Sequence, residues 1–332
     1  MKRSKMILLS TGSLLCICLC ILASLALGAK SISFPEVIGA LLHKEDTSFY
    51  ALIVRERVPR TIFSMLAGAS LGVSGALMQA ITRNPIADPS ILGVNTGASL
   101  FVVSGIAFFN ISTAGQYIWL ALIGAGITAA FVYAIGSLGY GGATPIKLAL
   151  AGAATSAALS SLVSAVTLPR TQVMNVFRFW QVGSTSGATW EGITTVLPFL
   201  AVGLLIGIFS APALNALALG EEVATGLGVR TGLVRIISAL AGVLLCGATT
   251  ALAGPIGFVG LMIPHTVRML CGSDMRYIIP LSAVGGAILL TISDVAGRLL
   301  AYPGELEAGI ITAFLGAPIL IIIAMRAKVQ AL

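Results

Sequence analysis

Residues 61–80 read TIFSMLAGASLGVSGALMQA, without one charged side chain. A run of about 20 apolar residues is long enough for an α-helix to cross the hydrocarbon core of a bilayer. Its glycine, alanine and serine residues are typical of closely packed membrane helices, because small side chains let neighbouring backbones approach. This stretch therefore predicts a transmembrane helix packed among others.

Similar runs recur along the whole chain. Hydrophobic residues make up 57% of the 332 residues and charged residues only 9%, too few to cover a soluble protein of this size. The runs predict spans at 6–29, 61–80, 91–109, 117–138, 146–168, 193–209, 234–252, 256–270, 278–298 and 309–325. We expect an all-α polytopic membrane protein with about ten transmembrane helices, forming a single domain over residues 1–332.

The charged residues indicate the orientation. Lys2, Arg3 and Lys5 favour a cytoplasmic N-terminus, and an even number of spans returns Arg326 and Lys328 to the same side. The first apolar run is too long for a typical signal peptide, so we expect an uncleaved span. Both termini are thus predicted to be cytoplasmic, and the net charge of +7 reflects topology rather than nucleic-acid binding.

Two small-residue segments lie in spans of opposite predicted direction. LAGASLGVSGA (residues 66–76) and LAGVLLCGA (residues 240–248) share their spacing of glycine and alanine. This pattern is compatible with an inverted repeat of the kind that transporters use. It is equally compatible with chance, since all spans rich in glycine and alanine look alike.

Catalytic motifs are missing from the sequence. There is no GxxxxGK[ST] loop for ATP, no HExxH and no GxSxG, and the five cysteines have no metal-binding spacing. We therefore predict no enzyme activity, no cofactor and no metal site. An ion-coupled transporter usually carries acidic residues within its spans, and only Asp294 qualifies. Because Asp294 lies near the outer end of its span, we favour an interhelical hydrogen-bonding role for it.

The segment after the first quoted run contains an unusual turn. In RNPIADPSILG (residues 83–93), Pro85 and Pro89 hold the preceding residues extended, while Asn84 and Asp88 can cap nearby backbone groups. Taken alone, this stretch predicts a stiff hairpin between two spans.

Together with SGALMQ (residues 74–79), however, this turn resembles the signature of the FecCD/BtuC-like permeases of ABC importers for iron–siderophores, haem and cobalamin. RVPR (57–60), GPIGFVGLMIPHTVR (254–268) and TAFLGAP (312–318) match the family in the same order. The motif residues are Gln79, Asn84, Pro85, Asp88, Pro89, Gly93, Pro264, His265 and Arg268. For His265 we expect a structural hydrogen bond rather than metal binding or proton relay.

The resemblance implies a transport subunit in the cytoplasmic (inner) membrane of a bacterium. Such a subunit works as a homo- or heterodimeric pair with a second permease subunit, two cytoplasmic ATP-binding subunits and an extracytoplasmic substrate-binding protein. A ferric siderophore is the expected cargo, with haem or cobalamin as the alternative within the family. An ion-coupled secondary transporter is the alternative outside it.

The longest cytoplasmic loop, about residues 211–233, contains LGEEVATGLGV, a short amphipathic pattern. Such a helix can dock into a groove of a partner protein or lie on lipid headgroups. The resemblance implies the first role, contact with the ATP-binding subunit. The residues concerned are Leu219, Gly220, Glu221, Glu222, Ala224, Gly226, Leu227 and Gly228.

The stretch RERVPR (residues 55–60) directly precedes the apolar run at Thr61 and falls on the predicted outer side. From the residues alone it is either a basic flank or a binding site. The family's RxPR pattern implies that Arg57 and Arg60 pair with acidic residues of the binding protein, and Arg298 opens onto the same face. Arginine suits this role because its planar fork pairs bidentately with carboxylates.

The transport pathway is also suggested by the sequence. LALAGAATSAALSSLVSA (residues 148–165) is rich in small and hydroxyl side chains, which can line a wide, weakly binding passage or pack against a neighbour. The resemblance implies that the fifth and tenth spans line the pathway. One departure lies at its mouth, where PGELEAG (residues 303–309) has Glu307 in place of a family proline.

Overall fold

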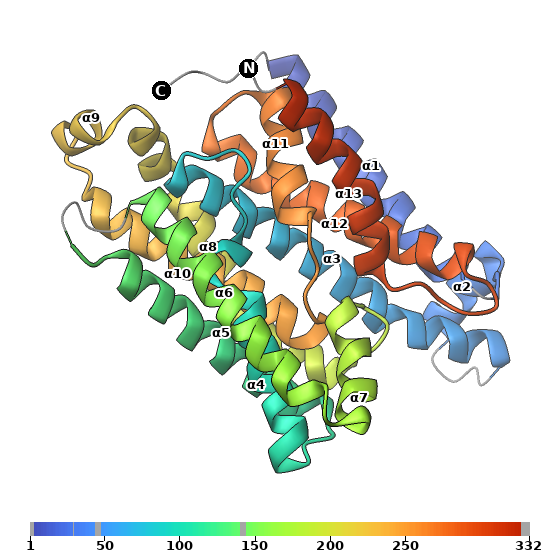
Figure 1. Cartoon of the computed structure of the whole chain (residues 1–332). Helices are drawn as coiled ribbons and strands as arrows, with labels where there is room; N and C mark the ends of the chain where they lie inside the picture. Colours follow the sequence, from blue (N-terminus) through green and yellow to red (C-terminus); the bar gives the residue numbers. More distant parts are fainter. Residues whose placement is uncertain (1–2, 29, 44–47, 140–143, 327–332) are drawn as a thin grey trace.

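The computed structural model of the chain describes residues 3–28, 30–43, 48–139 and 144–326 (Figure 1). Within these ranges the regular elements are helices, and no β-strand occurs. The α-helices are α1 (Arg3–Ala26), α2 (Phe34–Leu42), α3 (Phe49–Thr82), α4 (Val94–Phe109), α5 (Ala114–Gly136), α6 (Pro145–Thr167), α7 (Thr171–Val182), α8 (Trp190–Ala218), α9 (Glu221–Gly226), α10 (Thr231–Ala253), α11 (Val259–Cys271), α12 (Met275–Leu300) and α13 (Ala308–Arg326). A short 3-10 helix, η1 (Pro89–Leu92), precedes α4.

Six of these helices are long and apolar enough to cross a membrane, namely α3, α5, α6, α8, α10 and α12. Shorter apolar helical stretches lie in α1, α4, α11 and α13. The prediction of an all-helical polytopic membrane protein is therefore confirmed. The predicted spans agree closely with several helices, since residues 146–168 and 278–298 correspond to α6 and α12.

The largest difference concerns α3. We expected this span to begin at Thr61, but the helix begins at Phe49 and includes the whole RERVPR stretch, with Pro59 in its interior. The stretch is therefore part of the helix rather than a flank. The prediction failed because four charges and a proline normally end an apolar span, whereas here the arginines have partners elsewhere in the chain. These partners are backbone carbonyls for Arg57 and carboxylates for Arg60. The sequence analysis also did not predict α2 and α7.

Helix α3 lies at the centre of the bundle and packs against α8, α10, α11 and α12. At three glycines of α3, its backbone lies directly against the backbone of a neighbouring helix. A Cβ atom on Gly68 would collide with the backbone of Gly286, and one on Gly75 with the backbone of Gly260. Gly72 meets the carbonyl of Ser282 in the same way. The small-residue pattern in the quoted run therefore serves close helix packing, as predicted.

The two segments of the suspected repeat contact one another. The hydroxyl of Ser74 on α3 donates a hydrogen bond to the carbonyl of Gly242 on α10, and the two helices pack along their small-residue faces. This contact explains why both segments are rich in glycine and alanine without the need for a repeat. An inverted repeat stays a prediction.

The helix ends define two faces of the bundle. Figure 1 shows α9 at the end of the bundle where α1 begins and α13 ends, with α2 and α7 toward the opposite end. For brevity, the end that carries α9 is called the α9 face, and the other end is called the α7 face. The functional residues predicted from the sequence are distributed between these two faces and the interior.

Candidate functional site

A cavity of about 540 Å³ lies between α4, α6, α7 and residues 255–257. Its lining is rich in hydroxyl and amide side chains, namely Asn95, Thr96, Ser99, Ser160, Ser164, Thr167 and Gln181. Arg178 is the charged residue among the described residues that line it, beside Met174 and Phe177. The predicted fifth span, which is α6, thus contributes to a polar cavity.

Two hydroxyl groups on α6 that line the cavity have partners within the helix. Ser164 donates its hydroxyl proton to the carbonyl of Ser160 at 3.0 Å, and Thr167 donates to that of Val163 at 2.9 Å. Their donors are therefore used within the helix, and mainly oxygen lone pairs remain for the cavity. These two hydroxyl groups therefore offer the cavity hydrogen-bond acceptors rather than donors.

The inner wall of the cavity is stabilised through Asn95. Its Oδ1 accepts a hydrogen bond from the hydroxyl of Thr250 on α10 at 3.0 Å, and Sγ of Cys246 lies 3.6 Å away. Sequence reasoning missed Asn95 and Arg178, because neither stands in a recognisable charge or metal pattern.

The turn before this wall has the stiffness predicted from its prolines. Asn84 Oδ1 accepts from the backbone N–H of Ile86 at 3.1 Å, and Asp88 Oδ1 accepts from that of Ser90 at 2.9 Å. Pro89 begins η1, and Gly93 follows it with φ of 71°, where a Cβ would also press on Thr128. These residues hold the entry to α4 in one conformation, as predicted from the sequence.

Two motif fragments that are distant in sequence meet next to this turn. Gln79 on α3 donates from Nε2 to the carbonyl of Leu261 at 3.1 Å, and its Oε1 accepts from Nη1 of Arg268 at 3.2 Å. Pro264 is buried between these contacts on α11. The hydrogen bond expected for His265 is not found at Nδ1, which is buried without a partner among the described residues.

The three arginines predicted for docking gather at the α7 face, but each has partners within the chain. Arg57 is 9% exposed and donates to the carbonyls of Leu25 at 2.8 Å and Lys30 at 2.7 Å. Arg298 is 2% exposed and donates to the carbonyl of Ser24 at 2.9 Å. These two arginines brace the C-terminal end of α1.

Asp294 is the counter-ion of this group. Its carboxylate pairs with Nη2 of Arg60 at 2.8 Å and with Nη2 of Arg298 at 3.0 Å, and it accepts from the hydroxyl of Thr185 at 2.8 Å. The interhelical role predicted for Asp294 is therefore confirmed. Nη1 of Arg60 also reaches Glu305 at 2.8 Å.

Arg60 and Glu305 are the members of this group nearest to solvent. The side chain of Glu305 is 39% exposed and that of Arg60 13% exposed. Arg55, which the resemblance does not cover, donates to the carbonyl of His43 at 3.0 Å rather than to Glu56. The pair of Arg60 and Glu305 thus offers a charged point that an approaching protein can reach.

At the α9 face, α8 continues to Ala218 and α10 begins at Thr231, so the loop is shorter than the expected 211–233. The short amphipathic helix predicted there is α9. Gly220 with φ of 121° precedes it and Gly228 with φ of 82° follows it, conformations that favour glycine. Ala224 is buried, while Leu219 and Leu227 are 66% and 64% exposed. Val223 within α9 is also exposed, so the helix and the two leucines that flank it present apolar side chains outward.

A hydrogen-bonded pair supports the same face. Asp274 caps α12 by accepting from the backbone N–H of Arg276 at 2.9 Å, and it accepts from Nδ2 of Asn215 at 2.6 Å. Asn215 in turn accepts from the N–H of Met275 at 2.8 Å. These hydrogen bonds, first from Arg276 and then from Asn215, hold the pKa of the Asp274 carboxyl below its usual value. The pair joins the end of α8 to the start of α12.

Known proteins resemble this chain over most of its length. The chain matches the model of the FecCD transport family over residues 15–326. It is 40% identical over 316 residues to the ferric enterobactin transport system permease protein FepD of Escherichia coli (strain K12), covering 95% of this chain and 94% of that one. It is 41% identical over 305 residues to the Fe(3+)-citrate import system permease protein YfmD of Bacillus subtilis (strain 168), covering 92% and 90%.

Two further similarities bear on cargo and fold. The hemin transport system permease protein HmuU of Yersinia pestis is 31% identical over 314 residues, covering 93% of this chain and 92% of that one. A solved structure described as an inward-facing, metal-chelate type ABC transporter aligns with a TM-score of 0.82 at 28% identity, covering 95% of this chain and 98% of that chain. On the family match and these relatives together, the chain belongs to the FecCD transport family.

Proposed function

We propose that this chain is the permease subunit of an ATP-driven importer whose cargo is a ferric siderophore chelate. The observation that carries the proposal is the polar cavity between α4, α6 and α7, within a chain whose relatives include permeases for ferric enterobactin and ferric citrate. Its hydroxyl lining suits a large hydrated chelate that must pass without being trapped. Haem is the second candidate cargo because of the similarity to HmuU.

The proposed topology has ten spans, made of the six long apolar helices and α1, α4, α11 and α13. Both termini and the α9 face are cytoplasmic in this proposal, and the α7 face is extracytoplasmic, in the inner membrane of a bacterium. The whole chain, residues 1–332, acts as one permease domain. Permeases of this family lack an ATPase site, so partner subunits supply the ATP hydrolysis.

The proposed assembly contains two permease subunits, two ATP-binding subunits and an extracytoplasmic binding protein. The exposed leucines that flank α9, Leu219 and Leu227, support docking of the ATP-binding subunit there. At the other face, Arg60 is the proposed contact for an acidic residue of the binding protein, which would replace Glu305 as its partner. Arg57 and Arg298 would act beneath it by holding α1 and α12 in position.

Uptake by reconstituted liposomes tests this proposal. We expect labelled ferric chelate to accumulate only when the ATP-binding subunit, internal ATP and the binding protein are all present. A panel of ferric catecholate, ferric hydroxamate, ferric citrate, haem and cobalamin would identify the cargo. Uptake driven by an ion gradient in the absence of the ATP-binding subunit would instead identify a secondary transporter. The ion pairs of Asp294 with Arg60 and Arg298 argue against that outcome, because they already balance the charge that a coupling ion would need.

A further inference from the structure

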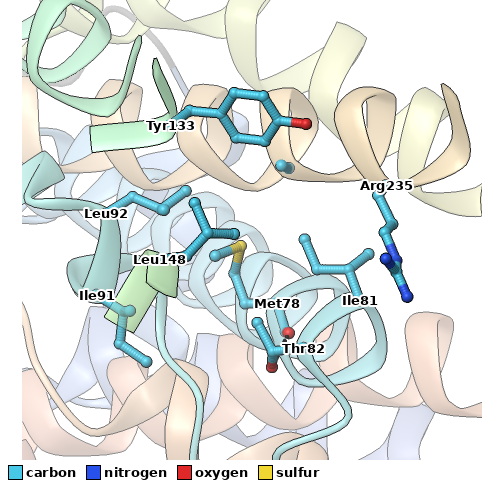
Figure 2. Close-up of a pocket in the computed structure, with 9 residues that line it drawn as sticks. Met78, Ile81, Thr82, Ile91, Leu92, Tyr133, Leu148 and Arg235 are labelled. Carbon is cyan, nitrogen blue, oxygen red and sulfur yellow. Dashed lines mark hydrogen bonds between the residues drawn. The ribbon is translucent and has the colours of Figure 1, made fainter. Parts of the chain in front are cut away.

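Two further cavities lie on a different side of the bundle, and residues of α5 and α10 line both of them. The larger has a volume of about 280 Å³ and the smaller about 30 Å³. Leu92, Tyr133 and Ala239 line both, so the two spaces are adjacent, and together they are called the groove. Figure 2 shows the smaller cavity, with Leu92 toward one end and Arg235 at the other.

The groove is built from small residues of α5 that face α10. Gly126, Ala129 and Ala130 form one wall, and Ala239 and Val243 form the other. A Cβ atom added to Gly126 would meet no other atom within 4 Å, so a larger side chain there would occupy space in the groove. Since a water molecule occupies about 30 Å³, the larger space holds a stretch of hydrocarbon chain, and its apolar wall offers water few hydrogen bonds.

The surroundings of the groove face the membrane. Ile127 and Phe131 on α5 are each 53% exposed, and Leu240 on α10 is 62% exposed. Both helices are among the six that can cross a bilayer. Exposed apolar side chains on such helices contact lipid, so a lipid chain is the molecule at hand to fill a groove between them.

The end of the groove near the α9 face carries a positive charge. Arg235 lies one turn inside α10, and its Nε is buried without a hydrogen-bond partner among the described residues. Its Nη2 makes a 3.3 Å contact with Glu221, whose side chain is 55% exposed. The guanidinium is therefore only partly satisfied and has donors left for an anion.

We propose that this groove binds an anionic phospholipid, with one acyl chain between α5 and α10 and the phosphate at Arg235. A basic residue between membrane helices at the cytoplasmic interface is suited to an anionic headgroup. The long arginine side chain reaches the headgroup layer while its aliphatic part stays among apolar residues. The orientation of the site rests on the proposed topology, but lipid binding itself does not depend on the cargo.

The site has a direct link to α9. A phosphate at Arg235 competes with Glu221, the first residue of α9, for the same guanidinium. Lipid binding would therefore leave Glu221 with the hydrogen bond from Thr231 as its link to α10 and weaken how firmly α9 is held there. The headgroup composition of the membrane would in this way adjust the element proposed to contact the ATP-binding subunit.

Native mass spectrometry of the purified full-length permease tests the proposal. The protein is mixed with phosphatidylglycerol or phosphatidylcholine of the same chains, and the retained lipid is counted. We expect wild type to retain phosphatidylglycerol about tenfold better, and Arg235→Gln to lose this preference, since one charge-assisted contact is removed. Gly126→Leu fills the groove and should lower retention of both lipids.

Matched variants keep the test decisive. Gly115→Leu places the same side chain in open space at the other end of α5, and Arg276→Gln removes an exposed arginine from the α9 face away from the groove. Both should behave like wild type. Equal retention of the two lipids by wild type, or unchanged retention by Gly126→Leu, would overturn the proposal. So would displacement of the lipid by soluble glycerophosphoglycerol at equal concentration, which would identify a simple phosphate site. If the protein bound the lipid as expected but showed no ATP-driven chelate uptake, that result would count against the proposed function and not against the lipid site.

Discussion

Arg60 on α3 and Asp294 on α12 form a two-point contact, with Nη2 of the arginine 2.8 Å and Nε 2.9 Å from Oδ1 of the carboxylate. The side chain of Asp294 is 1% exposed and also holds Arg298 and Thr185. One carboxylate thus joins α3, α12 and the segment that follows α7. Its removal would leave buried arginines without their shared counter-ion.

Asp294→Asn should destabilise the protein strongly. Breaking a buried ion pair by removing one partner costs about 3–5 kcal/mol, because the remaining charges stay desolvated. We expect a thermal midpoint lower by several degrees in detergent, measured by the fluorescence of the tryptophans. Glu305→Gln is the matched control, since its half-exposed pair with Arg60 contributes about 0–1 kcal/mol. Equal shifts for the two variants would contradict the central role of Asp294.

Charge reversal at Arg60 should weaken docking of the binding protein. With Arg60→Glu, an acidic partner residue meets a like charge, and we expect the dissociation constant to rise about tenfold or more. Surface plasmon resonance on the nanodisc-embedded complex measures this. Arg55→Glu makes the same change on the same helix outside the RxPR pattern and should leave docking intact. Arg60→Glu also removes one of the two arginine partners of the buried Asp294, so its thermal midpoint and its co-purification with the ATP-binding subunit are measured alongside. Weaker docking counts for the prediction only where this co-purification persists, as it should in both variants.

The exposed apolar face of α9 should hold the ATP-binding subunit. Leu227→Asp places a charge on a side chain that is 64% exposed, so the fold is preserved while an apolar contact is lost. We expect about tenfold weaker co-purification of the ATP-binding subunit, with docking of the binding protein unchanged. Leu300→Asp, exposed at the end of α12, is the control. If Leu227→Asp assembled normally, α9 would be better described as an interfacial helix.

Gly75→Ala should disrupt packing of α3 against α11. The added methyl group collides with the backbone carbonyl of Gly260, which cannot rotate away as a side chain could. Overpacking of this kind costs about 1–3 kcal/mol or more. The variant should lower both expression and thermal midpoint, whereas Gly232→Ala, in open space within α10, should be neutral or slightly stabilising. A tolerated Gly75→Ala would show that the two helices separate readily.

Asp274 should contribute stability that depends on pH. Its pKa is lower in the folded protein than in the unfolded chain, so its stabilisation is fully present above about pH 4, the unfolded value. It is lost as the pH falls through the lower folded pKa. Asp274→Ala should cost about 1 kcal/mol at pH 7 by loss of the helix cap. The difference in thermal midpoint between wild type and variant should shrink as the pH is lowered below 4.

The helix pattern was predictable because the membrane imposes a simple rule on composition. The ends of α5, α6 and α12 follow from where apolar residues stop. The start of α3 was not predictable in this way. Its arginines look like a flank until Asp294, which stands 234 residues further along the chain, is placed beside Arg60.

Some residues of the candidate site were likewise predictable from the sequence, and others were not. The turn at residues 83–93 was predictable, since Asn84, Asp88 and the prolines act on their own neighbours. Arg178 was not, because α7 is short and ambiguous in hydropathy, and only the fold brings it beside α4 and α6. The burial of Arg57 was likewise hidden, since its partners are backbone carbonyls of another helix.

The glycine contacts of α3 limit how this protein can move. Where Gly68, Gly72 and Gly75 rest on the backbones of α11 and α12, no flexible side chains lie between the helices to absorb sliding or rotation. These three helices must therefore travel together as one rigid block. Any alternation between openings on the two sides of a membrane has to take place at the softer boundaries of that block, where side chains can change rotamer.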